Sequence, residues 1–251
     1  MTTANKPAAK NRYELWQDTI AGALTDARWH EYDCDVQRAA TEFNRHLADT
    51  QGYSAFDWRM IKAMIWTESG GPTHREWRSN PMQIGNPGDP GLQALLSAKE
   101  GGELIMPPDL MKKLTVANAG SAPQMNIRAG MAYLLMRLAR FDVGTVQDKS
   151  DNKMYSVVVK AGDSLDKIAR VNGTTVDNLK MHNASTGVLR AGKALRYQKA
   201  QIRKMIVGWE SITTMRIAAR YNVGDPNYAK KLDYCMSMIR GRKASDMVCA
   251  Q

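Results

Sequence analysis

The sequence lacks long apolar runs and is poor in cysteine. No stretch approaches 18 uninterrupted apolar residues, so no helix that spans a membrane is expected. The three cysteines, Cys34, Cys235 and Cys249, match the spacing of neither a zinc site nor a disulfide framework. We expect three buried or free thiols, with a Cys34–Cys235 bridge as the alternative in an oxidising compartment. Neither a metal nor a cofactor is expected.

The first ten residues also lack the apolar segment of a secretory signal, since they are polar and rich in Ala, Thr and Lys. Residues 1–12 are predicted to be a disordered lead. We expect the chain to be made in the cytoplasm and to leave it by a route other than the Sec pathway.

Basic residues outnumber acidic ones. Lys and Arg total 35 against 25 Asp and Glu, a net charge of +10, while 43% of the residues are apolar, as in a globular protein. This surplus suits nucleic acid, an anionic membrane or a cell-wall polymer. The basic residues available for nucleic acid are Arg190, Lys193, Arg196, Lys199, Arg203 and Lys204. They have little aromatic interleaving and form no recognised motif, so no nucleic-acid partner is expected.

Apolar residues recur at helical spacing over most of the chain. The spacing predicts helices within residues 13–47, 54–68, 126–138, 199–219 and 227–239. Ser54, three residues before Asp57, is the predicted N-cap of the second helix, and Asn126 that of the third. Residues 72–125 are predicted to be irregular apart from short runs at 92–98 and 108–114, and residues 141–153 to be a polar linker.

Residues 154–198 have a different pattern. Residues 155–160 contain three consecutive valines, the strongest strand signal in the chain, and a second short strand fits residues 194–197. Two short helices, at 164–171 and 175–181, are predicted between them. The segment is therefore predicted to be a β-α-α-β unit.

Glu68 is the residue whose position suggests chemistry. It follows Ile61 by seven residues and Met64 by four, so its carboxylate lies on the helix face that carries the apolar stripe. Desolvation there raises the pKa of a carboxyl group and suits a general acid near neutral pH, as in cleavage of a glycosidic bond. Taken alone, the residue fits equally well a glutamate that reaches solvent at the end of a helix.

Four segments carry a family resemblance. They are Trp-Thr-Glu-Ser-Gly-Gly at 66–71, Asn-Pro-Met-Gln-Ile-Gly at 80–85, Asn-Ile-Arg-Ala-Gly-Met-Ala-Tyr-Leu at 126–134 and Ala-Ala-Arg-Tyr-Asn-Val-Gly at 218–224. Together, and in this order, they resemble the motifs of the lysozyme-like soluble lytic transglycosylase family. The resemblance implies a mainly α, lysozyme-like (α+β) catalytic domain.

The resemblance also implies an activity and a set of site residues. Such enzymes cleave the β-1,4 bond between N-acetylmuramic acid and N-acetylglucosamine, with one glutamate, here Glu68, as acid and then base. Met82 and Gln83 would line the glycan groove, and Tyr221 would lie close to the glutamate. Two further substrate-binding candidates also have structural explanations: Tyr133 fits a core position and Asn222 a helix stop.

A muramidase, which is a hydrolytic lysozyme of the same fold, is the alternative activity, and it needs a second carboxylate. The irregular stretch offers Glu76, Asp89, Glu100 and Glu103. Asp89, in Gly-Asp-Pro, is better explained as a turn residue. Transglycosylation needs no second carboxylate and is favoured. A non-catalytic structural wall protein of the same fold is a third hypothesis.

Residues 154–198 are very similar to a LysM module, which binds N-acetylglucosamine polymers in a shallow groove. The resemblance rests on Tyr-Ser-Val-Val-Val-Lys-Ala-Gly-Asp-Ser-Leu at 155–165, Thr-Val-Asp-Asn-Leu at 175–179 and Leu-Arg-Ala-Gly at 189–192. It implies two sugar-binding loops, whose candidate residues are Gly162, Asp163, Ser164, Leu165, Asn183 and Leu189. The alternative is a spacer that no longer binds sugar.

The order of the segments predicts an interrupted domain. Three of the enzyme-like motifs precede the LysM-like segment and one follows it, so the module is inserted in a surface loop of a catalytic domain formed by residues 13–150 and 199–251. Glu68 and Tyr221 are then expected to face one cleft.

Such an enzyme would act in the periplasm or cell wall, with peptidoglycan glycan strands as its partner. Without a secretory signal, injection into a target bacterium, for instance by type VI secretion, or release as a phage lysin would bring it there. An antibacterial effector is slightly favoured, and its partners would include an immunity protein or a component of the secretion apparatus.

Overall fold

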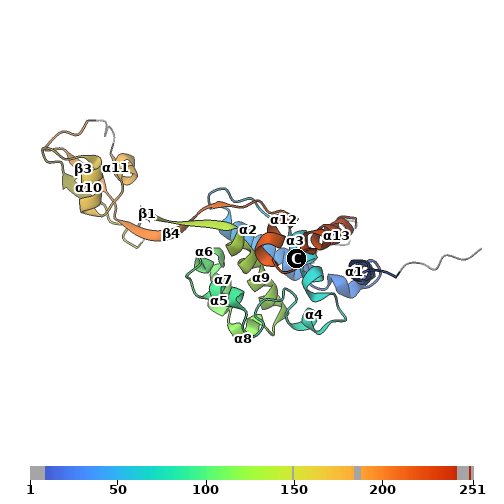
Figure 1. Cartoon of the computed structure of the whole chain (residues 1–251). Coiled ribbons are helices and arrows are strands. Elements are labelled where there is room, and N and C mark those ends of the chain that lie inside the picture. The colour runs from blue at the N-terminus through green and yellow to red at the C-terminus, as the bar shows by residue number, and fades with distance from the viewer. Residues whose placement is uncertain (1–8, 149, 184–187, 242–248, 250–251) are drawn as a thin grey trace, which may run out of the picture. The chain divides into compact units, whose positions relative to one another are not determined.

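The computed structural model describes residues 9–148, 150–183, 188–241 and 249. The chain forms two compact units, shown in Figure 1: residues 1–140 together with 206–251, and residues 141–205. The second unit interrupts the first along the chain. Of the predicted disordered lead, residues 1–8 lie outside the described residues. Asn11 already caps the first helix through the backbone N–H of Glu14, so residues 11 and 12 do not belong to such a lead.

The first unit is built mainly from helices. In chain order these are α1 (Arg12–Ala21), α2 (Asp33–Leu47), α3 (Trp58–Ser69), α4 (Arg75–Ser79), α5 (Pro90–Leu96), α6 (Gly102–Ile105), α7 (Pro108–Lys113), α8 (Val116–Ala119), α9 (Pro123–Leu138), α12 (Thr214–Tyr221) and α13 (Tyr228–Arg240), with the 3-10 turns η1 (Gly22–Leu24) and η2 (Ala27–His30). The predicted helix over 13–47 is thus interrupted at 22–32. Residues 72–125 contain α4 to α8, which are too short to produce a clear apolar period.

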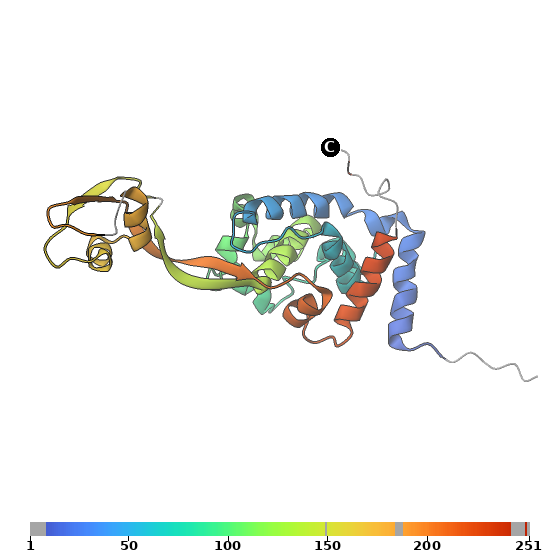
Figure 2. The same ribbon diagram turned by 90° about the horizontal axis from the view of Figure 1, so that it is seen from above.

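The core of this unit lies around α3 and α9. Helix α3 packs against α2 and α13, while α9 packs against α5, α6, α8 and α12. Side chains that are fully buried there include Phe43, Leu47, Ile61, Met64, Ile127, Met131, Leu232 and Ile239. Helix α1 lies alongside α13 (Figure 2). The rings of Trp16 on α1 and Tyr234 on α13 have centroids 5.8 Å apart. The last turn of α3, which carries Glu68, is therefore held on several sides.

Two helices begin at residues other than those predicted. The N-cap of α3 is Asp57, whose side chain accepts a 3.0 Å hydrogen bond from the backbone N–H of Arg59, so Ser54 is not the cap. Helix α9 begins at Pro123, a residue suited to a first helical position because it lacks an N–H. Asn126 consequently lies inside α9 and is fully buried. Its amide is free to bind a neighbouring loop.

Residues 139–147 and 200–209 form strands, β1 (Ala139–Gln147) and β4 (Ala200–Trp209), which pair as a two-stranded sheet. The predicted linker over 141–153 is therefore largely a strand, and the predicted helix from residue 199 is wrong up to residue 209. In β4, Ile206 and Gly208 are buried alternately while Ile202 is 76% exposed. The apolar residues of β4 have the spacing of a helical stripe, but they do not all face the core, because side chains along a strand point alternately to its two faces.

The second unit contains β2 (Tyr155–Val158), α10 (Leu165–Asn172), α11 (Val176–His182) and β3 (Ala194–Tyr197), which confirms the predicted β-α-α-β order. Strands β2 and β3 pair antiparallel, with Tyr155 opposite Tyr197. Ser164 and Thr175 cap the two helices. The buried core consists of Val159, Ile168, Ala169, Leu179, Leu195 and Tyr197.

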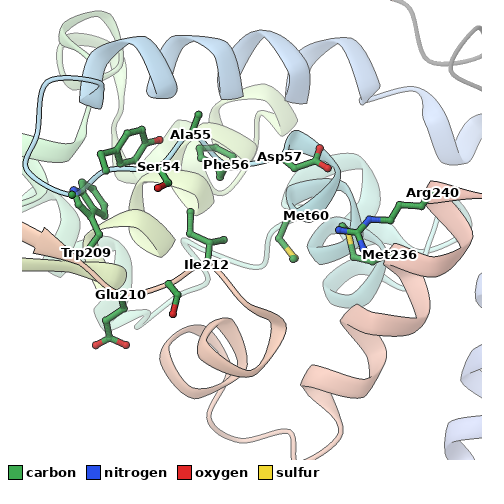
Figure 3. Close-up of a pocket in the computed structure, with 13 residues that line it drawn as sticks. Ser54, Ala55, Phe56, Asp57, Met60, Trp209, Glu210, Ile212, Met236 and Arg240 are labelled. Carbon is green, nitrogen blue, oxygen red and sulfur yellow. The ribbon is translucent and has the colours of Figure 1, made fainter.

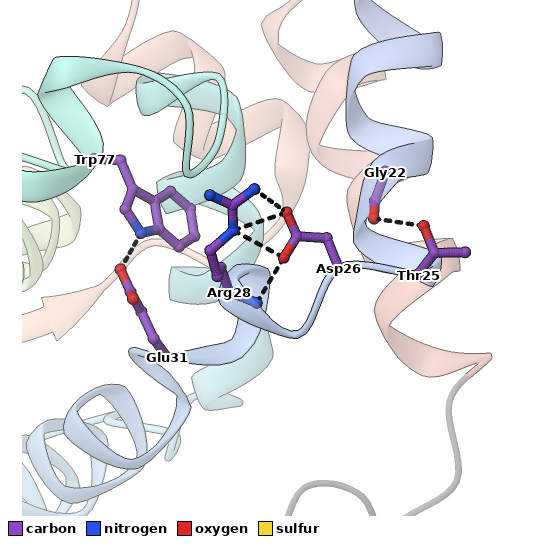
Figure 4. Close-up of polar contacts among 6 residues, drawn as sticks. All are labelled: Gly22, Thr25, Asp26, Arg28, Glu31 and Trp77. Carbon is purple, nitrogen blue, oxygen red and sulfur yellow. Dashed lines mark hydrogen bonds and ion pairs between the residues drawn. The ribbon is translucent and has the colours of Figure 1, made fainter.

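The chain after α3 is anchored to the turn before α2. The indole N–H of Trp77 donates to Glu31, as Figure 4 shows, and the Tyr32 hydroxyl donates to the Trp77 carbonyl at 2.7 Å. Gly71 has a φ of +102°, and a Cβ there would lie 2.3 Å from the Trp29 ring. The backbone that follows Glu68 is thereby fixed against the rest of the unit.

The prediction of buried or free thiols is confirmed at Cys235 alone. Cys34 forms a disulfide with Cys249, their Cα atoms being 5.3 Å apart, whereas Cys235 is free and buried. A Cys34–Cys235 bridge is excluded because α13 turns Cys235 toward α3, where its sulfur lies 3.7 Å from the Thr67 hydroxyl. Burial raises the pKa of the Cys235 thiol to about 12.

The described residues provide neither a membrane-spanning helix nor a metal-binding cluster. Among them no helix combines the length and apolar character needed to cross a membrane. The same residues contain no group of three or more His, Cys, Asp or Glu side chains placed to hold a metal ion.

Candidate functional site

Glu68 lies in the last turn of α3. The helix ends at Gly70, which has a left-handed φ of +70° and donates its N–H to the carbonyl of Trp66. Glu68 is partly exposed, and it borders a small cavity of about 220 Å³. The glutamate therefore faces a cavity rather than open solvent.

The structure brings the predicted site residues of the first unit together. The wall of this cavity includes Met82, Gln83, Tyr133, Tyr221 and Asn222 as well as Glu68. They come from α3, the loop before α5, α9 and the end of α12, segments that are distant in sequence. Glu68 and Tyr221 thus share one cavity, as the order of the motifs predicts.

The loop that carries Met82 and Gln83 is fixed by Asn126. The buried amide of Asn126 accepts a 2.7 Å hydrogen bond from the backbone N–H of Met82 and donates to the carbonyls of Ile84 and Ala119, at 2.7 and 2.6 Å. Gln83 has a φ of +54°, an uncommon conformation for a residue other than glycine. Strained backbone of this kind clusters at functional sites when the surroundings hold it in place.

Tyr221 holds the same loop from the other side. Its hydroxyl donates a 2.7 Å hydrogen bond to the Met82 carbonyl, and its ring contacts the Tyr133 ring edge-on at 5.6 Å. Met82 is fully buried, so its side chain is a packing element of the cavity floor rather than a surface for substrate. Gln83, unlike Met82, brings a polar side chain to the cavity.

The carboxyl group of Glu68 is desolvated and hydrogen-bonded. Burial raises its pKa, while hydrogen bonds from Tyr228 and Asn222 and the charge of Lys231 lower it only in part. The Tyr228 hydroxyl donates to Oε1 of Glu68 at 2.5 Å. Asn222 therefore does more than end α12, because its side chain also contacts the glutamate. A carboxyl that retains its proton at higher pH than usual can act as a general acid.

Asp89 is the only other carboxylate on the cavity wall among the described residues, and both of its oxygens are engaged. Oδ2 accepts the N–H of Gly85 at 2.6 Å, and Oδ1 accepts that of Gly91 at 2.7 Å as the N-cap of α5. This supports the interpretation of Asp89 as a turn residue. The other acids considered as a second carboxylate, Glu76, Glu100 and Glu103, do not line the cavity.

The candidate sugar-binding residues of the second unit have mainly structural contacts. Asn183 uses its whole amide on backbone groups, two of them on Arg196 of β3. Asp163 accepts the N–H of Lys160, which lowers the pKa of its carboxyl group, and Ser164 caps α10. Leu165 and Leu189 pack against the core.

Among the described residues of the candidate loops, little side-chain chemistry is therefore free apart from the Ser164 hydroxyl proton. Gly162 takes a φ of +81° at the turn, with nothing within 4 Å of where a Cβ would stand. Residues 184–187 of the second loop lie outside the described residues.

Tyr228 and Asn126 are the site residues that the sequence reasoning missed. Tyr228 is 1% exposed and stands among the inward residues of α13. A buried tyrosine on an apolar face needs a partner for its hydroxyl, and that requirement is the signal that could have identified it. For Asn126 the helical period gave no comparable signal, because a helix cap and a buried amide look alike in sequence.

Comparison with known proteins identifies the smaller unit. Residues 157–196 match the LysM domain family. No curated protein matches the chain, and no solved structure matches it. The β-α-α-β core of the second unit is therefore a LysM domain, a module of the peptidoglycan-binding class.

Proposed function

We propose that the chain is a peptidoglycan lytic transglycosylase whose first unit cleaves the glycan strand and whose LysM domain holds it on the wall. The observation that carries the proposal is the desolvated carboxyl of Glu68, bonded to Tyr228 on the wall of a cavity shared with Gln83 and Tyr221. The four motifs resembling the soluble lytic transglycosylase family supply the substrate class.

The reaction requires one carboxyl group in two protonation states. Protonated Glu68 donates its proton to the glycosidic oxygen as the bond from that oxygen to C1 of the N-acetylmuramic acid breaks. The resulting carboxylate then removes the proton of the C6 hydroxyl of the same sugar. O6 bonds to C1, which closes a 1,6-anhydro ring and leaves Glu68 protonated again. No water is consumed.

The surroundings of Asp89 favour this reaction over hydrolysis. A hydrolase with two carboxylates needs a second acid that can act as base or nucleophile. The two backbone N–H groups that bind Asp89 occupy an acceptor site on each of its oxygens and fix the carboxylate in the turn before α5. A muramidase of the same fold remains the second candidate, and it would have to use this carboxylate.

The LysM domain would serve as a tether. Binding of the module to glycan raises the effective concentration of substrate at a catalytic unit in the same chain. The net charge of +10 would assist docking on an anionic wall, and this contribution would weaken with salt. We also propose that the enzyme acts in the periplasm, as an injected antibacterial effector or a phage lysin.

Digestion of purified sacculi tests the proposal. Wild-type protein should release muropeptides with 1,6-anhydro ends, detected by mass spectrometry, and Glu68→Gln should lower the rate by at least a hundredfold. The matched control is Glu76→Gln on α4, a carboxyl outside the cavity, which should retain activity. Reducing N-acetylmuramic acid ends would establish a muramidase instead. Absence of release by the wild type would leave a non-catalytic wall protein.

A further inference from the structure

The first unit contains a second, larger cavity that shares no lining residue with the Glu68 cavity. Its volume is about 580 Å³, within the range of roughly 300–1,000 Å³ typical of small-ligand sites. It lies between the segment before α3, the residues after β4 and the last half of α13 (Figure 3). Its floor includes Phe56, Met60 and Met236, all buried.

One end of this cavity is a preorganised aromatic wall. The rings of Tyr53 and Trp209 meet edge-on with centroids 4.9 Å apart. Their polar atoms are already satisfied, since the Tyr53 hydroxyl donates to Asn44 at 2.7 Å and the Trp209 indole N–H donates to Thr50 at 3.1 Å. The rings therefore offer the cavity an apolar surface whose position is fixed before any ligand arrives.

The charges around the cavity leave one cation in excess. Asp57 is engaged by Arg59 and by its role as N-cap, and Glu210 is paired with Arg220 and lies 3.6 Å from the guanidinium of Arg216. The guanidinium of Arg240 makes no hydrogen bond or ion pair with the part of the chain that the structure describes. In Figure 3 Arg240 lies beside Met236 at the end away from Trp209. The cavity is thus complementary to a ligand with an apolar body and an anionic group.

The segment before α3 adds unpaired backbone groups. Ser54 and Ala55 are exposed, lie outside any helix or strand and line the cavity. Within the described residues their N–H and carbonyl groups have no backbone partner, whereas Phe56 next to them is held at both groups by Asn44. An open backbone edge of this kind binds extended peptides through main-chain hydrogen bonds. A lipid tail would leave these groups unused, and a neutral sugar would leave Arg240 without a counter-ion.

We propose that this cavity binds a short peptide with a free carboxylate, which pairs with Arg240 while apolar side chains pack on Trp209 and Met60. The peptide class follows from the cavity itself. Its identification as a peptidoglycan stem, which carries alanine methyl groups and free carboxylates, rests on the proposed function. The protein would then contact the wall through stem peptides as well as glycan.

The test measures binding of a synthetic stem tetrapeptide ending in D-Ala to the full chain by isothermal titration calorimetry at low salt. Arg240→Gln should raise the Kd at least tenfold, because the carboxylate loses its counter-ion. The matched control is Arg75→Gln, an exposed arginine on α4 that does not line the cavity and should leave the Kd unchanged. The same tetrapeptide with all of its carboxylates amidated should bind weakly and equally to the wild type and to Arg240→Gln.

Three binding results would overturn the proposal. No binding at millimolar peptide, or equal Kd values for the wild type and Arg240→Gln, would show that this cavity is not a peptide site. Displacement of the peptide by chitotetraose would assign the cavity to sugar. Digestion of peptide-free glycan strands, measured separately, distinguishes the peptide site from the proposed enzyme function. If the wild type binds the peptide but does not cleave these strands, the enzyme function is rejected and the peptide site is retained.

Discussion

The hydroxyl of Tyr228 donates a 2.5 Å hydrogen bond to Oε1 of Glu68, although 160 residues separate them in the chain. Tyr228 is the first residue of α13 and Glu68 lies in the last turn of α3, and these two helices pack against each other. The bond stabilises the ionised carboxyl and partly offsets the effect of burial. Tyr228 thereby lowers the pKa of Glu68 part of the way back toward its ordinary value, without being part of any motif.

Tyr228→Phe should shift the pH dependence of cleavage. Without the phenol the pKa of Glu68 rises further, because burial remains and one stabilising hydrogen bond is lost. The basic limb of kcat/KM, which follows loss of the proton from the general acid, should move to higher pH. The control is Tyr13→Phe, since the Tyr13 hydroxyl contacts the carbonyl of Lys230 and not the cavity. An unchanged limb would contradict the role given to Tyr228.

Glu68→Gln should be more stable than the wild type at pH values above the ordinary pKa of a glutamate. The Glu68 carboxyl holds its proton more tightly in the folded protein than in the unfolded chain, where its pKa lies near 4.5. As pH rises from 4.5 through the pKa of the folded state, this group therefore lowers the stability of the folded protein. The substitution removes that penalty. Thermal unfolding should give a higher Tm for the variant at pH 7 and no difference near pH 3. Equal Tm values at pH 7 would argue that the carboxyl is not desolvated.

Gly130→Ala should destabilise the protein and displace Met82. A Cβ at Gly130 would lie 2.6 Å from Cβ of Met82, and overpacking of this kind costs about 1–3 kcal/mol. Because Gln83 follows Met82, cleavage should fall along with stability. Gly224→Ala is the comparison, since the nearest atom to its added Cβ is 3.9 Å away. Urea unfolding measures the stability of both variants. An unchanged free energy of unfolding for Gly130→Ala would mean that the loop of Met82 adjusts to the added methyl group.

Reduction should weaken the first unit by opening the Cys34–Cys249 bridge, which spans 215 residues of sequence. A disulfide of this kind typically contributes about 2–4 kcal/mol by restricting the unfolded chain. Cys34→Ser should lose the same amount and become insensitive to dithiothreitol. Cys235→Ala, which keeps the bridge, should still respond to the reductant in urea unfolding. A wild type that ignores the reductant would show that the bridge does not form in solution.

Much of the second unit was predictable because its signals are local. Consecutive valines mark β2, Ser164 and Thr175 stand where caps are required, and β3 has the predicted bounds. Strand β4 was not predictable, because its apolar residues fit a helical period and the choice depends on which of them find a core. Ile202 finds none.

The candidate site divides in the same way. The sequence by itself determined that Glu68 lies at the end of an apolar helix. It also determined that the family-like motifs at residues 80–85, 126–134 and 218–224 follow Glu68 in the chain. Only the tertiary structure decided that Tyr228 bonds the glutamate, that Asn126 holds the loop of Met82, and that Cys34 pairs with Cys249. The physical reason is that these partners lie 44 to 215 residues apart in the chain, so helix packing brings them together and no local pattern marks them.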